Sequence, residues 1–326
     1  MNHALSRRAT LACGTALLLS LSGAVHAQSG GPLRIVLPVG AGSGVDTIMR
    51  AAQNELSKAL GGQPVIIDNL PGAGGITGTT AIVKAAPDGN TIGVVSNNHA
   101  VNPSVFKKLP YDSINDITPI SVVGSTPFVL VVNPTKVPAK TAKELQAFLK
   151  AKPGVYNYGS AGNGTIIHLA AEMFIDAAGA EVRHIPYKGT GAQIADLIGG
   201  QVELGVVALP AIQGHLKSGA LRAIGVMGKT RVASLPDLPT IAEQGFPEVD
   251  IAGWFAVIGP AKLPEAQVMR IHDAFVSAFG SAEVKAAMAR QENVIAPTTP
   301  DTALQFFKSE QARYAALVKK ADIKLD

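Results

Sequence analysis

Apolar and polar residues alternate along the chain in blocks that predict strands and helices in turn. From residue 33 onwards, "LRIVLPV", "PVIID" and "TIGVVS" are short apolar runs typical of buried strands. Amphipathic helices are expected between them at residues 45–60 and 76–86. Because strands that alternate with helices favour βαβ units and parallel sheets, the first third of the chain is expected to form an α/β lobe.

The same alternation restarts after "FVLVVNP". Strands are expected at "VYNYG", "EVRHIPY", "VELGVVA" and "LRAIGVMG". Helices are expected between them at residues 142–152, from residue 165, and at residues 192–198. This second block predicts a second lobe of the same class.

The last third of the chain, after "GWFAVIGP", predicts helices without a strand among them. The expected helices are at residues 264–279, 282–290 and 302–321. Because these helices have no sheet of their own to cover, we expect them to pack on the first lobe. The chain would then cross between lobes twice, near residues 125–133 and 252–260.

The predicted fold class is therefore α/β, with two doubly wound lobes joined by a hinge and a ligand cleft between them. The expected boundaries are 1–27 for a signal peptide, 28–128 for the first part of lobe 1, 129–253 for lobe 2, and 254–326 for the C-terminal helices that return to lobe 1.

The N-terminal segment has the pattern of a secretory signal. Arg7 and Arg8 precede an apolar run at residues 11–21, and Val25 and Ala27 supply the small residues of a cleavage site. The run is shorter than the roughly 20 residues of a membrane span. We expect export and cleavage after Ala27, whereas the choice between the general and the twin-arginine route stays open.

Charge and cysteine content narrow the possible functions. Without Arg7 and Arg8, the exported chain has 26 of the 28 basic residues and all 24 acidic ones, so its net charge is close to zero. Such a charge gives no basic surface for nucleic acid. Cys13 falls in the signal, so the exported chain has no cysteine for disulfides or thiolate catalysis. The remaining histidines lack the spacing of paired metal ligands. No metal, cofactor or catalytic residue is expected.

Two segments share the order strand, glycine loop and helix, one in each predicted lobe. They are "IVLPVGAGSGVDTIMRAA" and "YNYGSAGNGTIIHLAAEM". The first imitates a dinucleotide fingerprint, with Asp68 ending the next strand, but Val45 occupies the place of the third glycine. An exported oxidoreductase that binds a dinucleotide at the GAGSG loop is the alternative hypothesis.

Both loops have the features of an anion site. Their glycines let backbone N–H groups approach a ligand, and the following helices present unpaired N–H groups and a positive dipole end. Side-chain donors are available at Ser43, Ser160, Asn163 and Thr165, and His168 lies on the first turn of the second helix. The plainer interpretation is that Thr165 only caps its helix and the glycines only turn the chain.

Several segments together resemble the extracytoplasmic solute receptors of tripartite tricarboxylate transporters, also called Bug receptors. The matching segments are "IIDNLPGAGGITGT", "AAPDGNTI", "NPSVFKKLPYD", "YNYGSAGNGTIIHLAAEMF", "HIPYKGTGAQIADLIGGQVEL", "HLKSGALRAIGV", "LPDLPTIAEQG" and "ADIKLD". The resemblance implies a periplasmic binding protein of type II-like fold, a monomer and not an enzyme, that delivers a small organic anion to integral membrane permease subunits or to a sensor kinase.

The resemblance also implies which positions look toward the ligand. The ligand-binding residues carried over in this way are Gly40, Ala41, Gly42, Ser43, Gly44, Asp46, Ser96, Asn97, Asn98, Ser160, Ala161, Gly162, Asn163, Gly164, Thr165, His168, Gly189, Thr190, Gly191 and Ala208.

The chain departs from many relatives at two points. It has "GAGSGVD" where they have a Pro-Gly-Gly turn, which leaves the contacts of the first loop open. It has "VALPAI" where they carry an acidic residue after the "VEL" strand. A ligand ammonium group would therefore lack an acceptor, and an aliphatic or aromatic mono-, di- or tricarboxylate is expected instead of an amino acid.

Overall fold

The computed structural model describes residues 31–320, so the predicted signal peptide at 1–27 lies outside the described residues. Within this part no helix combines the length and the apolar character needed to cross a bilayer. The strands form two sheets, one with six strands and one with five. The predicted class of two α/β lobes is confirmed.

The first sheet takes its strands from both ends of the described chain. It contains β1 (Leu33–Leu37), β2 (Val65–Asn69), β3 (Thr91–Ser96), β4 (Ile117–Thr126), β10 (Gly253–Pro260) and β11 (Val294–Ile295). Their order is β11-β4-β10-β3-β1-β2. Every residue of β10 is buried, as expected for a strand in the middle of a sheet with both faces covered.

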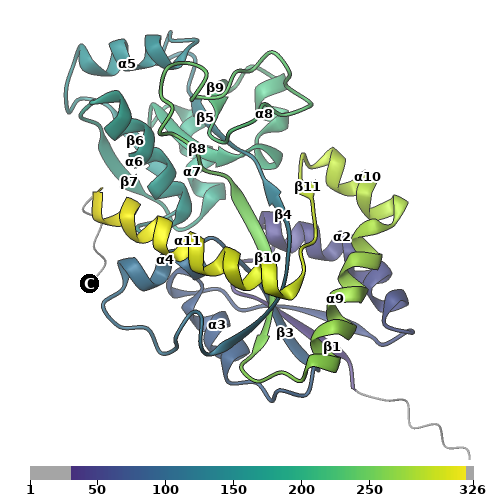
Figure 1. Cartoon of the computed structure of the whole chain (residues 1–326). Helices are drawn as coiled ribbons and strands as arrows, with labels where there is room; N and C mark the ends of the chain where they lie inside the picture. The colour runs from purple at the N-terminus through teal and green to yellow at the C-terminus, as the bar shows by residue number, and fades with distance from the viewer. Residues whose placement is uncertain (1–30, 321–326) are drawn as a thin grey trace, which may run out of the picture. The chain divides into compact units, whose positions relative to one another are not determined.

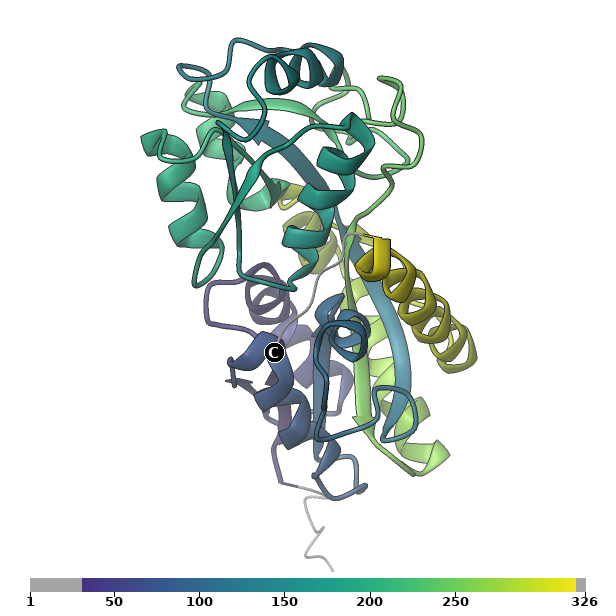
Figure 2. The same cartoon turned by 90° about the vertical axis from the view of Figure 1, so that its left-hand side faces the viewer.

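The second sheet is continuous in sequence. It contains β5 (Phe128–Val132), β6 (Asn157–Ser160), β7 (Arg183–Pro186), β8 (Leu204–Ala208) and β9 (Arg222–Val226), in the order β7-β6-β8-β5-β9. Figure 2 shows this teal and green part of the chain as one group and the purple and blue segments of the first sheet as another.

The helices lie between these strands. Those of the first half are α2 (Gly44–Ala59), the 3₁₀ turn η1 (Ala73–Gly75), α3 (Ile76–Val83) and α4 (Asn98–Val105). Those of the middle are α5 (Ala142–Lys150), α6 (Ile166–Ala178), α7 (Thr190–Gly199), η2 (Leu209–Ala211) and α8 (Gln213–Lys217). Three more follow β10, namely α9 (Glu265–Gly280), α10 (Ala282–Arg290) and α11 (Pro300–Lys320).

The three C-terminal helices pack mainly on the first sheet and its helices, as the lack of a strand partner predicted. Helix α9 lies against α2, and α11 lies against α4 and β4. Figure 1 shows α11 in yellow, with its last turns reaching α6 of the second sheet. The expectation of no strand in this region was wrong, because β11 pairs with β4 through Val294 and Ile295. Two residues are too few for an alternating pattern to be detected.

Both sheets are mixed, whereas the βαβ rhythm predicted parallel ones. The pairs of β1 with β2 and β3, and of β6 with β7 and β8, are parallel. The strands that carry the chain between the sheets are antiparallel to their neighbours, with β10 against β3 and β4, and β5 against β8 and β9. A strand that arrives directly from the other sheet has no crossover helix to bring it in parallel.

The crossing is held by buried hydrogen bonds around Asn97. Its Nδ2 donates to the carbonyl oxygen of Ala252 at 3.0 Å and to the Tyr314 hydroxyl at 2.7 Å, and its Oδ1 accepts from the Trp254 backbone N–H at 2.9 Å. The indole N–H of Trp254 in turn donates to Glu310 and Tyr314. These bonds tie the end of β3, the return crossing and α11 together.

Replacing Asn97 with alanine is expected to lower the free energy of unfolding by at least about 2 kcal/mol, because each buried polar group left without a partner costs about 1–3 kcal/mol. Urea denaturation of the purified protein measures the change. The matched control is Asn115→Ala, since Asn115 is exposed and its side chain bonds only to Asp112. Equal stability of the two variants would contradict the role given to Asn97.

Candidate functional site

The predicted ligand positions lie after the carboxyl ends of parallel strands. In the first sheet β1 and β3 are parallel, so residues 40–44 and 96–98 follow strands that end at one edge. In the second sheet β6 is parallel to both β7 and β8, so residues 160–165, 189–191 and 208 share one edge in the same way. Open α/β sheets bind their ligands at such edges.

The first glycine loop, residues 40–44, is braced from within by Asp46. This carboxylate is 3% exposed. It accepts the Gly42 N–H at 2.8 Å, the Asn69 side-chain amide at 3.0 Å and the Arg50 guanidinium at 3.0 Å. Burial opposes its charged form, but these hydrogen bonds outweigh burial and lower the pKa of Asp46. The positive φ of Gly42, 78°, lets the loop turn back onto this carboxylate.

This geometry disfavours the dinucleotide alternative. The Asp46 carboxylate occupies the inside of the loop, where its charge would repel a pyrophosphate. Asp68, the candidate for a ribose contact, is bonded to Arg34, with the guanidinium Nη2 2.5 Å from its carboxylate oxygen.

The second glycine loop, residues 160–165, is held by its own hydroxyl groups. Ser160 is fully buried, and its Oγ accepts the Gly162 N–H at 3.1 Å. The Thr165 hydroxyl donates to the Gly162 carbonyl at 2.8 Å and accepts the His168 N–H, so it caps α6. Gly162 has a φ of 132°, which a residue with a side chain rarely adopts. The cap predicted from the sequence is therefore present, as part of a larger network.

Two histidines lie under this loop with their rings stacked. The ring centroids of His168 and His184 are 3.8 Å apart and their planes differ by 11°, and Tyr158 stacks on His184 at 4.8 Å. Burial, together with the neighbouring His184, lowers the pKa of His168 to about 3. Burial lowers the pKa of His184 to about 4. Both rings are therefore neutral at neutral pH.

One hydrogen bond joins the two sheets at the predicted site. The Asn98 side-chain oxygen, at the start of α4, accepts the backbone N–H of Ile166, the first residue of α6, at 3.1 Å. Within the second lobe the Tyr187 N–H donates to the Ser160 carbonyl at 3.0 Å. The structure thus brings residues 98, 160–165 and 187 together, while the hydrogen bonds described for residues 40–44 stay within the first lobe.

Three helices keep free backbone donors at their starts. Within residues 31–320, several N–H groups of the first turns or preceding loops donate no hydrogen bond. They belong to Gly44 and Val45 of α2, to Asn163 and Ile167 at α6, and to Thr190 and Gly191 of α7. Gly40, Ala41, Gly42, Gly44 and Asn163 are exposed. These helix starts supply the donors and the dipole that an anion site requires.

The predicted residues divide into two groups by environment. Asp46, Asn97, Ser160 and His168 are buried and bonded to protein atoms, which suits support of the loops. Ser96, Ala161, Gly189 and Ala208 are partly exposed beside the donors named above. For both groups, contact with a ligand stays a prediction.

Sequence reasoning missed the residues that brace the loops. They are Asn69, which bonds Asp46, and Tyr158, Glu172 and His184, which pack beneath residues 160–165. Their only sequence signal is position, since Tyr158 and His184 lie on the strands that lead into the second and third loops. Their pairing depends on strand register, which one sequence does not show.

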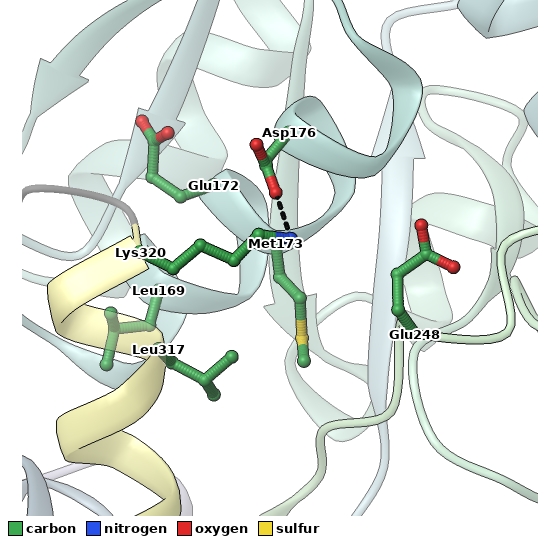
Figure 3. A pocket seen from close by; sticks show the side chains of 7 residues that line it. All are labelled: Leu169, Glu172, Met173, Asp176, Glu248, Leu317 and Lys320. Carbon is green, nitrogen blue, oxygen red and sulfur yellow. Dashed lines mark ion pairs between the residues drawn. The ribbon is translucent and has the colours of Figure 1, made fainter.

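Two cavities of the described structure lie away from the predicted residues. One of about 760 Å³ lies beside the crossing, between residues 226–234 and residues 289–294. Another, of about 60 Å³, lies between α6 and α11 and is shown in Figure 3. There Lys320 pairs with Asp176 at 2.6 Å, beside Glu172 and Leu317. This ion pair is a second link between the lobes.

The comparisons with known proteins agree with this arrangement. The family model of the tripartite tricarboxylate transporter family receptor matches residues 48–323. Protein BugT of Bordetella pertussis is 35% identical over 296 residues, which cover 90% of each chain.

Solved structures show the same fold. A periplasmic transporter is 36% identical with a TM-score of 0.84, over 92% of this chain and all of that one. Rpa4515 of R. palustris with adipate is 29% identical with a TM-score of 0.85, over 91% and 100%. MatC from Rhodopseudomonas palustris with bound malate is 26% identical with a TM-score of 0.80, over 89% and 99%. With a family model that matches most of the chain and a relative of 35% identity over nine-tenths of it, the protein belongs to the tripartite tricarboxylate transporter receptor family, among the Bug proteins.

Proposed function

We propose that the protein captures a small dicarboxylate at the starts of α2, α6 and α7 and delivers it to the membrane subunits of a tripartite transporter. The observation that carries this proposal is the set of free backbone N–H groups at these three helix starts. Helices α6 and α7 belong to one sheet and α2 to the other, so they suit the two ends of one ligand.

Backbone donors at helix starts can bind a dicarboxylate with micromolar affinity without an arginine side chain. A carboxylate at a helix start gains about 0.3–1 kcal/mol, or about 2 kcal/mol when partly buried. Hydrogen bonds to a charged group add about 1.5–3 kcal/mol each. Two carboxylates that each accept two backbone hydrogen bonds therefore supply the roughly 8 kcal/mol of a micromolar site.

The environment of the loops favours a dicarboxylate over an amino acid. Adipate and malate, the ligands of two structural relatives, both carry two carboxylates. A ligand ammonium group needs an anionic acceptor, but the Asp46 carboxylate is already bonded to Gly42, Arg50 and Asn69. The residues after β8, Leu209–Ala211, offer no carboxylate.

Calorimetry with a panel of dicarboxylates, tricarboxylates, aromatic acids and acidic amino acids tests this proposal. At least one aliphatic dicarboxylate is expected to bind with a dissociation constant near the micromolar range, which corresponds to a binding free energy of about 8 kcal/mol. Aspartate and glutamate are expected to give no heat. If every anion leaves both the heat and the melting temperature unchanged, the proposal fails.

Gly162→Ala is expected to weaken dicarboxylate binding about tenfold or more, because strain at this φ displaces the donors of the loop and costs about 1–3 kcal/mol. The added Cβ would also lie 3.2 Å from the Tyr187 carbonyl oxygen. The matched control is Gly154→Ala, which also has a positive φ, 69°, but has no neighbour within 4 Å and lies outside the loops. Equal affinity of the two variants would remove residues 160–165 from the site.

A receptor that serves a transporter in this way must be exported. The family is one of periplasmic receptors, and the N-terminal pattern gives Ala27 as the last residue of the signal. Mass spectrometry of the protein recovered from the periplasm is expected to show Gln28 as the first residue. A mature chain that keeps the segment before residue 28 would contradict the cleavage site.

A further inference from the structure

Three aromatic side chains beneath residues 160–165, two buried and one partly buried, form a stack whose role the proposed function does not include. The rings of Tyr158 from β6, His184 from β7 and His168 from α6 form one cluster with nearly parallel planes, in which each ring stacks on the other two. Three different elements thus meet directly under the second glycine loop.

Each histidine holds the loop through one ring nitrogen. Nδ1 of His168 accepts the backbone N–H of Gly164 at 3.1 Å, so this nitrogen carries no proton. Nε2 of His184 lies 2.6 Å from the Ser160 Oγ, which itself accepts the Gly162 N–H. The positions of two glycine N–H groups therefore depend on two imidazole rings.

The contact of His168 requires a neutral ring. A proton on Nδ1 of His168 would point at the Gly164 N–H, and two donors cannot share that bond. A doubly protonated His184 would have to donate to the Ser160 Oγ, and the hydroxyl proton would then turn from the ring to the Gly162 carbonyl oxygen, 3.2 Å away. At a separation of 3.8 Å the two rings also repel each other when both are charged.

The groups that face the pair come from every element packed against it. From β6 there are Tyr158 and Ser160, and the Tyr158 hydroxyl donates to Oε1 of Glu172. From α6 there is Glu172, whose Oε1 lies 3.8 Å from Nε2 of His168, and one turn later Asp176.

Two further charged side chains line the small cavity beside Glu172 that Figure 3 shows. They are Lys320 of α11, which is paired with Asp176, and Glu248. Burial raises the pKa of Glu172, so on acidification this carboxyl group takes up its proton at a higher pH than an exposed carboxyl group does.

We propose that His168 and His184 are positioning residues for ligand capture: as neutral rings they set the geometry of residues 160–165, and protonation, which removes the acceptor for the Gly164 N–H at His168 and reverses the hydrogen bond between His184 and Ser160, releases the loop and the carboxylate it holds. The inference rests on the proposed function, and it adds His184 to the residues that control affinity. By reciprocity, a bound carboxylate favours the neutral rings, so its release takes up protons in the pH range in which the rings titrate.

The direction of the pH dependence follows from the lowered pKa values. At neutral pH both rings are neutral and the loop is formed. As the pH falls through the range of about 4 to about 3, the rings become charged and the affinity falls. In the unfolded chain a histidine titrates near 6.5, so the folded state also loses stability as the pH falls from that value.

The test compares variants that keep or remove the acceptor for Gly164. His168→Asn places an oxygen near the former Nδ1 and does not titrate, whereas His168→Leu leaves the Gly164 N–H without a partner. At neutral pH, His168→Leu is expected to weaken dicarboxylate binding about tenfold or more, and His168→Asn is expected to restore most of it. Equal affinities of the two variants overturn the inference.

A pH series separates positioning from packing. The double variant His168→Asn/His184→Gln is expected to lose less affinity on acidification than the unmodified protein. Protonation of the ligand weakens binding to both proteins equally, so the difference between them reports the protonation of the rings. His272→Gln, which changes a histidine of α9 bonded to Asp273, is the control and is expected to keep the original profile. The same acid loss in the double variant and in the control overturns the inference.

Amide spectra of the ligand-free protein supply a readout that does not depend on binding. The Gly162 and Gly164 N–H signals are expected to shift with the protonation of the two rings, and to lose that shift in the double variant. If the unmodified protein binds no carboxylate at any pH, the proposed function fails, and these spectra alone decide whether the histidines position the loop. Glycine signals that do not follow the rings overturn the inference.

Discussion

The first turn of an α-helix leaves backbone N–H groups without an acceptor inside the helix. The candidate site depends on which of these groups are hydrogen-bonded by other protein atoms and which stay free. Side chains satisfy some of these groups at each start, since Ser43 caps α2 and Thr165 caps α6. Others stay free beside glycines that keep the approach open. Buried groups such as Asp46 and His168 then fix the loops so that the remaining donors are held in place before a ligand arrives. Little ordering is left to do on binding, which favours affinity.

The two crossings between the sheets place these helix starts in different lobes. Asn97 ties β3, the return strand and α11 at the centre of the crossing. Asn98, the next residue, reaches the first N–H of α6. One short segment after β3 therefore contributes both to the hinge and to the contact between the lobes. A rotation of one lobe against the other would therefore act directly on the hydrogen bond between the Asn98 oxygen and the Ile166 N–H.

Much of this arrangement could be predicted from the sequence. Apolar residues recur with different periods in strands and in amphipathic helices, and glycine-rich loops are recognisable from their composition. The helices α2, α6 and α7 begin within two residues of the expected positions. Helix α4 was missed because "NP" within it signals a turn, and β11 because it has two residues. The supports of the loops were missed for a different reason. The stacking of His168 on His184, and the bonds of Asp46 to Asn69, depend on which strands pair and in which register.

The use of backbone N–H groups at the helix starts affects how such a protein can evolve. Backbone N–H groups are the same whatever side chain a position carries, so substitutions around residues 40–44 and 187–191 can reshape the space between the helix starts without removing the donors. Glycines with positive φ, such as Gly42 and Gly162, are the positions that resist exchange. If the helix starts capture a dicarboxylate as proposed, ligand preference can drift while anion capture is retained, and the number of carbons between the two carboxylates becomes the variable property of the scaffold.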